Sequence, residues 1–172
     1  MNKIKIAVSS CLLGEPVRYD GTDKQIKLIS DELANEYNLV SLCPEMAVGM
    51  GVPRPPIQLV DNGVDIEVLG VADPSVNMTQ PLKKYANEVI NNYMDICGYI
   101  FKKNSPSCGT KNVKVLGLNG NYELKGQGIY AESIIQALPE LPVIDEEDFL
   151  ISANRMLFLS RVKLYYKQVS SQ

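Results

Sequence analysis

Apolar and polar residues follow one another in short runs that predict an alternation of strands and helices. Four apolar runs of strand length are expected to be buried, because few polar residues interrupt them. These predicted strands are Lys3–Ser9, Asn38–Cys43, Gly98–Lys102 and Leu141–Asp145. Two further patterns alternate around the turn residues Asp61-Asn62-Gly63 and Asn119-Gly120, and each predicts a hairpin.

Apolar residues recur at helical spacing in several of the segments between these strands. The clearest predicted helix is Thr79–Ile96, which Thr79 can cap and whose first turn tolerates Pro81. Ile129–Leu138 and the amphipathic segment Glu146–Lys167 are also expected to be helical, and Ser30 predicts the cap of a short helix. The apolar face of the clearest helix consists of Leu82, Tyr85, Ala86, Val89, Ile90, Tyr93 and Met94.

Strands that alternate with helices indicate an α/β fold with a mainly parallel central sheet flanked by helices. We expect one Rossmann-like domain over residues 1–172, with a small hairpin excursion. In such sheets, ligands bind outside the carboxyl ends of the strands. The segments Leu12–Ile29 and Met46–Pro56 are rich in turn residues and are predicted to be loops at this edge.

Three of the four cysteines follow a predicted strand, and each precedes a loop rich in Gly, Pro or both. Cys11, Cys43 and Cys108 can therefore converge if their strands are neighbours in the sheet. Cys97 has a different setting, because it continues the apolar face of the predicted helix Thr79–Ile96. We interpret Cys97 as a small buried apolar residue.

Composition narrows the chemistry of such a site. The 172 residues include no histidine, which excludes Ser-His and Cys-His catalytic pairs. The net charge is −3 and no dense basic stripe occurs, so we expect a small-molecule substrate and no extended nucleic acid. No apolar run is long enough to span a membrane, and the N-terminus does not resemble a signal peptide. We therefore expect a cytoplasmic protein, as a monomer or weak dimer.

From the residues alone, three kinds of site remain open for the three thiols. A structural disulfide is disfavoured in the cytoplasm, and no CxxC motif indicates a redox nucleophile. Three thiolates suit a zinc hydrolase with Glu45 as its base, or a four-iron cluster with one iron open to substrate. A non-catalytic metal or cluster carrier is the third alternative, but it would leave Glu45 without a function.

Three motifs around these cysteines resemble the signature stretches of the 2-thiouracil desulfurase family, formerly catalogued as a domain of unknown function. They are SSCLLGEPVRYDG (Ser9–Gly21), CPEMAVGMGVPRPP (Cys43–Pro56) and KKNSPSCG (Lys102–Gly109). The resemblance implies a [4Fe-4S] cluster bound by Cys11, Cys43 and Cys108. It also implies conversion of a thiolated pyrimidine, such as 2-thiouracil, into the oxo compound with release of sulfide and no net redox change.

The resemblance further implies catalytic roles for Glu45 and Ser105. Ser107 is the alternative to Ser105 and a candidate substrate contact, and Asp20 and Arg54 are expected to anchor the substrate ring or each other. Ser9 and Ser10 are expected to donate hydrogen bonds to cluster sulfides. The second motif departs from the family pattern at VGMGVPRPP, where Met50 is expected to alter the shape of the substrate pocket.

Overall fold

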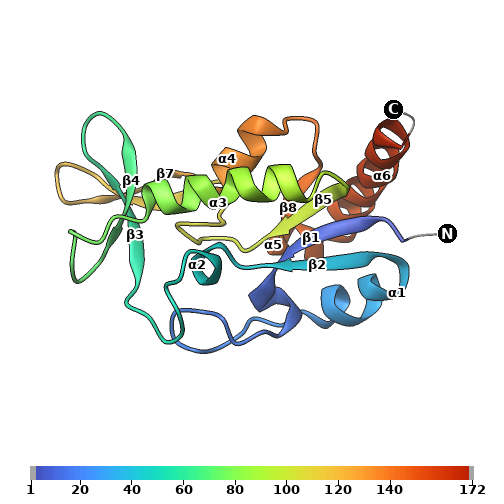
Figure 1. Cartoon of the computed structure of the whole chain (residues 1–172), viewed down its shortest axis with the longest axis horizontal. Helices are drawn as coiled ribbons and strands as arrows, with labels where there is room; N and C mark the ends of the chain where they lie inside the picture. The colour runs from blue at the N-terminus through green and yellow to red at the C-terminus, as the bar shows by residue number, and fades with distance from the viewer. Residues whose placement is uncertain (1–2, 171–172) are drawn as a thin grey trace.

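The computed structural model describes residues 3–170, and it contains a parallel sheet of four short strands. These strands are β1 (Lys5–Ser9), β2 (Asn38–Leu42), β5 (Ile96–Phe101) and β8 (Val143–Asp145). They lie in the order β2-β1-β5-β8, and each neighbouring pair is parallel. The predicted Rossmann-like α/β fold is confirmed, with helices on both faces of this sheet (Figure 1).

A second sheet of four strands lies at the opposite end of the molecule from α6 (Figure 1). Both predicted hairpins form within it: β3 (Ile57–Asp61) with β4 (Ile66–Gly70), and β6 (Val113–Leu116) with β7 (Tyr122–Gly126). The expected small excursion is larger than predicted, because β3 and β6 pair in parallel and join the two hairpins. This pairing buries Leu59 and Val115, which favours one sheet over two isolated hairpins.

Helices cover the two faces of the parallel sheet with separate apolar cores. Side chains alternate between faces along a strand, so Ala7 and Tyr99 belong to one core and Val8 and Ile100 to the other. The first core includes apolar residues of α3 (Thr79–Asn92) and α4 (Ile129–Ala137). The second core includes residues of the π-helix η2 (Leu28–Leu33) and of α6 (Ser152–Val169).

The helix predicted over Thr79–Ile96 is one turn shorter in the structure. Cys97 therefore does not continue a helix but lies in a strand. The helix ends at Asn92, and Ile96 begins β5, where it pairs with Lys5 of β1. Pairing with the sheet therefore overrides the helical pattern, and Met94 is exposed rather than part of the apolar face. Cys97 lies in β5 within the core beneath α6, so its interpretation as a buried apolar residue agrees with its surroundings.

The two predicted helix caps are wrong. The hydroxyl group of Thr79 accepts a hydrogen bond from the backbone N–H of Val68 (2.8 Å) instead of an N–H of its own helix, and this connects α3 to β4. Ser30 lies inside η2, which continues directly into α1 (Ala34–Glu36), so it caps neither element.

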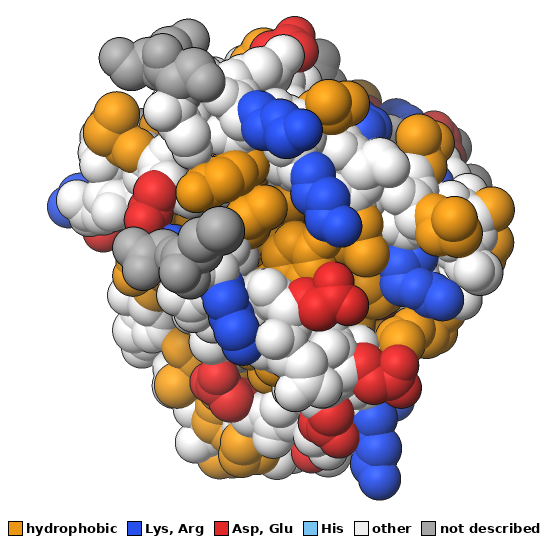
Figure 2. Space-filling model, turned by 90° about the vertical axis from the view of Figure 1, so that its right-hand side faces the viewer, with side chains coloured by type: hydrophobic (Ala, Val, Ile, Leu, Met, Phe, Trp, Pro, Cys, Tyr) orange, Lys and Arg blue, Asp and Glu red, His pale blue; other side chains and the backbone are white. Residues whose placement is uncertain are grey.

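The terminal segment forms two helices instead of one. The short helix α5 (Glu146–Leu150) ends before Ile151, whose backbone is extended, and α6 follows in a new direction. Phe158 and Val162 of α6 pack inward, whereas Met156, Leu157 and Leu164 are exposed on its outer side. Figure 2 views the molecule from this side and shows apolar side chains at the surface. Within residues 3–170, no helix is both long and apolar enough to cross a membrane.

Candidate active site

The three cysteines that follow strands line a single cavity of about 280 Å3 at the carboxyl edge of the parallel sheet. Cys11 lies in the 3-10 helix η1 (Ser10–Leu13) directly after β1, and Cys43 lies directly after β2. Cys108 belongs to the loop that follows β5. Because β1 lies between β2 and β5, the strand order brings residues that are 32 and 65 positions apart to one site.

Burial keeps these three thiols in their neutral form when nothing is bound to them. Burial raises the pKa of Cys11 to about 11, raises that of Cys43, and raises that of Cys108 well above its usual range. Cys43 and Cys11 further raise the pKa of Cys108, because a thiolate on either one would repel a second thiolate. All four cysteines are free, and Cys97 does not line the cavity.

Two kinds of metal site can be compared with these thiols. A zinc ion bound by three thiolates at about 2.3 Å each requires all three sulfurs within one small coordination sphere. Within residues 3–170, no three Cys, Asp or Glu side chains form a group that could hold a single metal ion. In an iron–sulfur cluster each thiolate binds a different iron, and the three thiols that line this cavity are available as such ligands.

Glu45 lies in the first turn of α2 (Pro44–Ala47), and both of its carboxylate oxygens are held by partners. Its Oε2 atom forms an ion pair with Arg54 Nη2 (2.6 Å) and accepts a hydrogen bond from Nε (2.8 Å). Its Oε1 atom accepts a hydrogen bond from the hydroxyl group of Ser107 (2.8 Å). Glu45 therefore has a fixed orientation at the wall of the cavity, two residues from Cys43.

The two serines of the third motif have different positions. Ser105 lines the cavity, and its Oγ atom accepts hydrogen bonds from the backbone N–H groups of Ser107 (3.2 Å) and Cys108 (3.0 Å). These two bonds use the oxygen as an acceptor and leave the hydroxyl proton available to a molecule in the cavity. Ser107 is fully buried, does not line the cavity, and donates its proton to Glu45.

The other predicted site residues are divided between the cavity and its surroundings. Arg54 lines the cavity but pairs with Glu45, whereas Asp20 lies outside it and bonds to Thr22 and Arg18. The expected pair between Asp20 and Arg54 is therefore absent. Ser9 and Ser10 line the cavity as expected.

Met50 lines a different cavity of about 450 Å3, which shares Arg54 with the first cavity. Met50 itself therefore does not line the first cavity, where it was expected to alter the shape of the substrate pocket.

The loop that carries Ser105 and Cys108 is seated on the first turn of α4. The carbonyl groups of Pro106 and Ser107 accept hydrogen bonds from the N–H groups of Ile129 (3.1 Å) and Ala131 (3.0 Å). These are donors that a helix leaves unpaired at its start. A Cβ atom at Gly128 would lie 2.4 Å from the backbone of Ser107, so the close approach of loop and helix requires glycine there.

Several residues of the cavity were not among the predicted site residues. Arg18, Tyr19, Lys24, Lys102, Lys103 and Asn104 also line it. Their position in the sequence could have indicated some of them. Lys102 directly follows β5, just as Cys43 directly follows β2, so both lie at the carboxyl edge of the sheet. Glu146 directly follows β8 and contacts Lys102, so the same signal would have indicated it.

Comparison with known proteins agrees with this fold and this arrangement of the motifs. A model of the 2-thiouracil desulfurase family matches residues 6–146. The chain belongs to the 2-thiouracil desulfurase family, as its three motifs predicted.

Two individual relatives extend the comparison. The uncharacterized protein YbbK of Bacillus subtilis (strain 168) is 30% identical over 142 residues, which cover 77% of this chain and 90% of YbbK. The structure of the [4Fe-4S]-dependent thiouracil desulfidase TudS (DUF523) superposes with a TM-score of 0.69 at 29% identity. That superposition covers 90% of this chain and 98% of TudS.

Proposed function

We propose that this protein is an enzyme that removes sulfur from a thiolated pyrimidine, such as 2-thiouracil, by means of a [4Fe-4S] cluster. The products are the oxo compound and sulfide, with no net change of oxidation state. The observation that carries the proposal is the shared cavity of Cys11, Cys43 and Cys108, whose wall also contains Glu45 and Ser105. Membership of the family and the similarity to TudS support it.

Cys11, Cys43 and Cys108 would hold the cluster as thiolates. When bound, the cluster supplies an iron without a protein ligand, whose affinity for sulfur suits the C=S group of the substrate. The three buried thiols are neutral without a cluster, so each must lose its proton when it binds iron as a thiolate. Ser9 and Ser10 line the same cavity and are placed to donate hydrogen bonds to cluster sulfur.

Exchange of sulfur for oxygen requires water, and the protein residues position it and move its protons. The oxygen of one water molecule forms a bond to the carbon of the C=S group, and the bond from carbon to sulfur breaks. The two protons of that water leave with the sulfur, so one water is consumed for each molecule of hydrogen sulfide formed. Glu45 accepts a proton from the attacking water at a carboxylate oxygen and delivers it to the departing sulfur.

Arg54 and Ser107 hold the carboxylate of Glu45 against the cavity wall, so little reorientation is needed for this transfer. Ser105 presents its free hydroxyl proton to the ring of the substrate and orients it. The cavity volume of about 280 Å3 suits a substrate whose reacting part is a single ring of the size of a pyrimidine base.

The function is tested with wild-type protein reconstituted anaerobically with iron and sulfide. We expect about four irons and four labile sulfides per chain, and conversion of 2-thiouracil to uracil with one sulfide released per turnover. Glu45→Gln is expected to keep its iron and to lose turnover by about 100-fold or more, because proton transfer typically contributes 10²–10⁴-fold. Zinc without labile sulfide would favour the hydrolase alternative, and a loaded cluster without turnover of any thio-base would favour a carrier.

Comparison of Ser105→Ala with Ser107→Ala separates the roles of the two serines. Because Ser105 faces the cavity, its replacement is expected to raise KM for 2-thiouracil. Replacement of Ser107 removes a bond to Glu45, so it is expected to lower kcat by about tenfold and leave KM nearly unchanged. Steady-state kinetics of the reconstituted variants measure both constants. An effect on kcat alone in Ser105→Ala would assign that serine to proton transfer instead of substrate binding.

A further inference from the structure

We propose that Lys102 and Glu146 form a positioning pair, which fixes the loop of Ser105 and Cys108 and holds a positive charge beside the cluster site. This inference rests on the proposed function. Neither residue is assigned a role by the resemblance or by the comparisons. Lys102 is the first residue of the third motif, KKNSPSCG, and Glu146 lies 44 positions further along the chain.

The register of the sheet places the two residues side by side. Phe101 at the end of β5 pairs with Asp145 at the end of β8. Lys102 and Glu146 are the next residues after these strands, so both emerge at the carboxyl edge on neighbouring strands. Lys102 lines the cavity, and Glu146 behind it is only 6% exposed.

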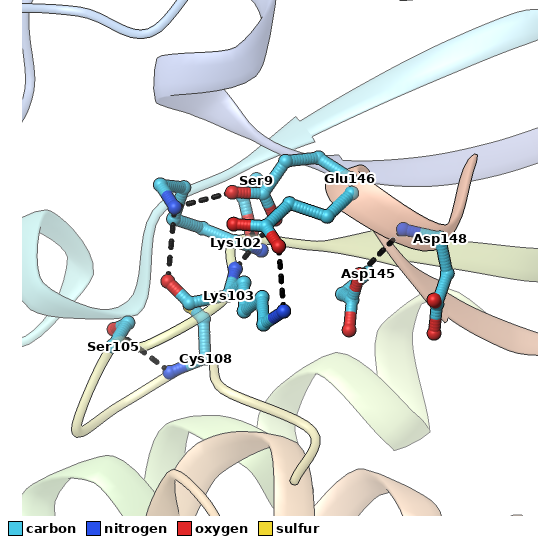
Figure 3. A network of polar contacts seen from close by, with 9 residues as sticks. Ser9, Lys102, Lys103, Ser105, Cys108, Asp145, Glu146 and Asp148 are labelled. Atoms are coloured by element: carbon cyan, nitrogen blue, oxygen red, sulfur yellow. Dashed lines mark hydrogen bonds and ion pairs between the residues drawn. The ribbon is translucent and has the colours of Figure 1, made fainter. Parts of the chain in front are cut away.

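Hydrogen bonds from both residues hold the start of the loop (Figure 3). Lys102 Nζ forms an ion pair with Glu146 Oε1 and also donates to the carbonyl oxygen of Lys103 (2.9 Å). The backbone N–H of Lys103 donates to Glu146 Oε2 (2.6 Å), and that of Lys102 donates to Ser9 Oγ (3.0 Å). The backbone that leads to Ser105 is therefore fastened to the end of β1 and to the first residue of α5.

The charge of Lys102 acts within the cavity. Lys102 lines the same cavity as Cys11, Cys43 and Cys108, and its ammonium group is held there by Glu146 and by the carbonyl oxygen of Lys103. A cluster with thiolate ligands adds negative charge to this site, and a partly buried ammonium group is screened by salt only weakly. Lys102 therefore stabilises a negatively charged cluster, and Glu146 keeps its side chain in place.

A second buried carboxylate makes the lysine more important. Asp145 is 1% exposed, and its Oδ1 atom accepts a hydrogen bond from the N–H of Asp148 (2.8 Å). Its Oδ2 atom is buried and has no hydrogen-bond partner among residues 3–170. Without Lys102, the buried carboxylate of Glu146 would lose its charged partner in a segment that already contains the buried carboxylate of Asp145, which is unfavourable in a site of low polarity.

The same loop and helix contain a natural control. Lys111 and Asp148 form an ion pair (2.6 Å) between the same loop and α5, but the Lys111 side chain is 53% exposed and does not line the cavity. Replacement of Lys111 removes the same positive charge as replacement of Lys102 but leaves the lining of the cavity unchanged. Glu147, the neighbour of Glu146, is 58% exposed and also does not line the cavity.

The experiment compares Lys102→Gln, Lys102→Arg and Glu146→Gln with the controls Lys111→Gln and Glu147→Gln. After anaerobic reconstitution, Lys102→Gln is expected to shift the midpoint potential of the cluster to more negative values and to lower kcat by about 10–100-fold. Lys102→Arg is expected to retain the potential, because it keeps the charge. Both controls are expected to match the wild type. Equal potentials in Lys102→Gln and Lys111→Gln would overturn the electrostatic part of the proposal.

Hydrogen exchange of the apoprotein provides a measurement that does not depend on the cluster. The amide of Lys103 is expected to exchange faster in Glu146→Gln than in wild type or in Glu147→Gln, because glutamine has one acceptor oxygen instead of two. Equal exchange in Glu146→Gln and Glu147→Gln would overturn the positioning role. If wild-type protein holds no cluster, the proposed function fails, and this exchange result still decides the positioning role. If Lys102→Gln does not fold, Glu146→Gln decides both parts, since its released lysine should alter the potential as well.

Discussion

Replacement of Cys11, Cys43 or Cys108 by alanine, one at a time, is expected to remove most of the bound iron and all measurable desulfuration. Each thiol lines the cavity, and the loss of one leaves two thiolates, which cannot hold a cluster that is already short of one protein ligand. Metal analysis, the cluster absorbance and the release of sulfide from 2-thiouracil measure this outcome after anaerobic reconstitution.

Cys97→Ala is the matched control for these three variants. Cys97 is also a free, buried cysteine, but it belongs to the core beneath α6 and does not line the cavity. Its iron content and turnover are expected to equal those of the wild type, with a modest loss of stability from the missing sulfur. Iron that stays bound in all three ligand variants would contradict the proposed cluster site. Iron that is lost in Cys97→Ala alone would contradict its structural interpretation.

Arg54→Met is expected to destabilise the apoprotein by about 3–5 kcal/mol, the cost of breaking a buried ion pair. Arg54 binds the carboxylate of Glu45 through Nη2 and Nε and donates to the carbonyl of Gly51 (2.8 Å). Methionine has a similar length but no charge, so the buried carboxylate of Glu45 would lose its main partner. The free energy of unfolding, measured in urea without cluster, reports this change.

Two further variants identify the cause of this loss. The double variant Glu45→Gln/Arg54→Met is expected to recover part of the stability, because the unpaired charge is then absent. Arg18→Met removes an arginine from a more exposed pair with Asp20 (3.4 Å) and is expected to lower the free energy of unfolding much less than Arg54→Met does. A loss in Arg54→Met that persists unchanged in the double variant would assign it to the bond with Gly51 and to packing.

The sequence predicted the elements that position the site. Its apolar runs identified the four strands of the parallel sheet, and its turn residues identified both hairpins. Strong local signals account for this success, because burial of a short apolar run and a turn at Asn-Gly depend on adjacent residues. The position of a cysteine after each of three strands was sufficient to predict their convergence, once the sheet was taken as parallel.

Where local signals competed with the sheet, the sheet decided. The helical pattern of Thr79–Ile96 continues through Met94, yet Ile96 pairs with β1 and the helix ends four residues earlier. Thr79 has the side chain of a helix cap, but its hydroxyl group serves the backbone of β4. In both cases, a contact with a distant strand provides a partner that the local sequence does not reveal.

The sequence by itself determined the parallel α/β fold and the hairpins, and it supplied the residues proposed for the site: three thiols, Glu45 and two serines. Only the tertiary structure decided which partners hold them. Ser107 bonds to Glu45 across 62 residues, and Lys102 pairs with Glu146 across 44. Such contacts depend on strand order and register, which arise from the packing of the whole sheet. A short segment of sequence does not encode such contacts, because its conformational preferences depend only on residues a few positions away.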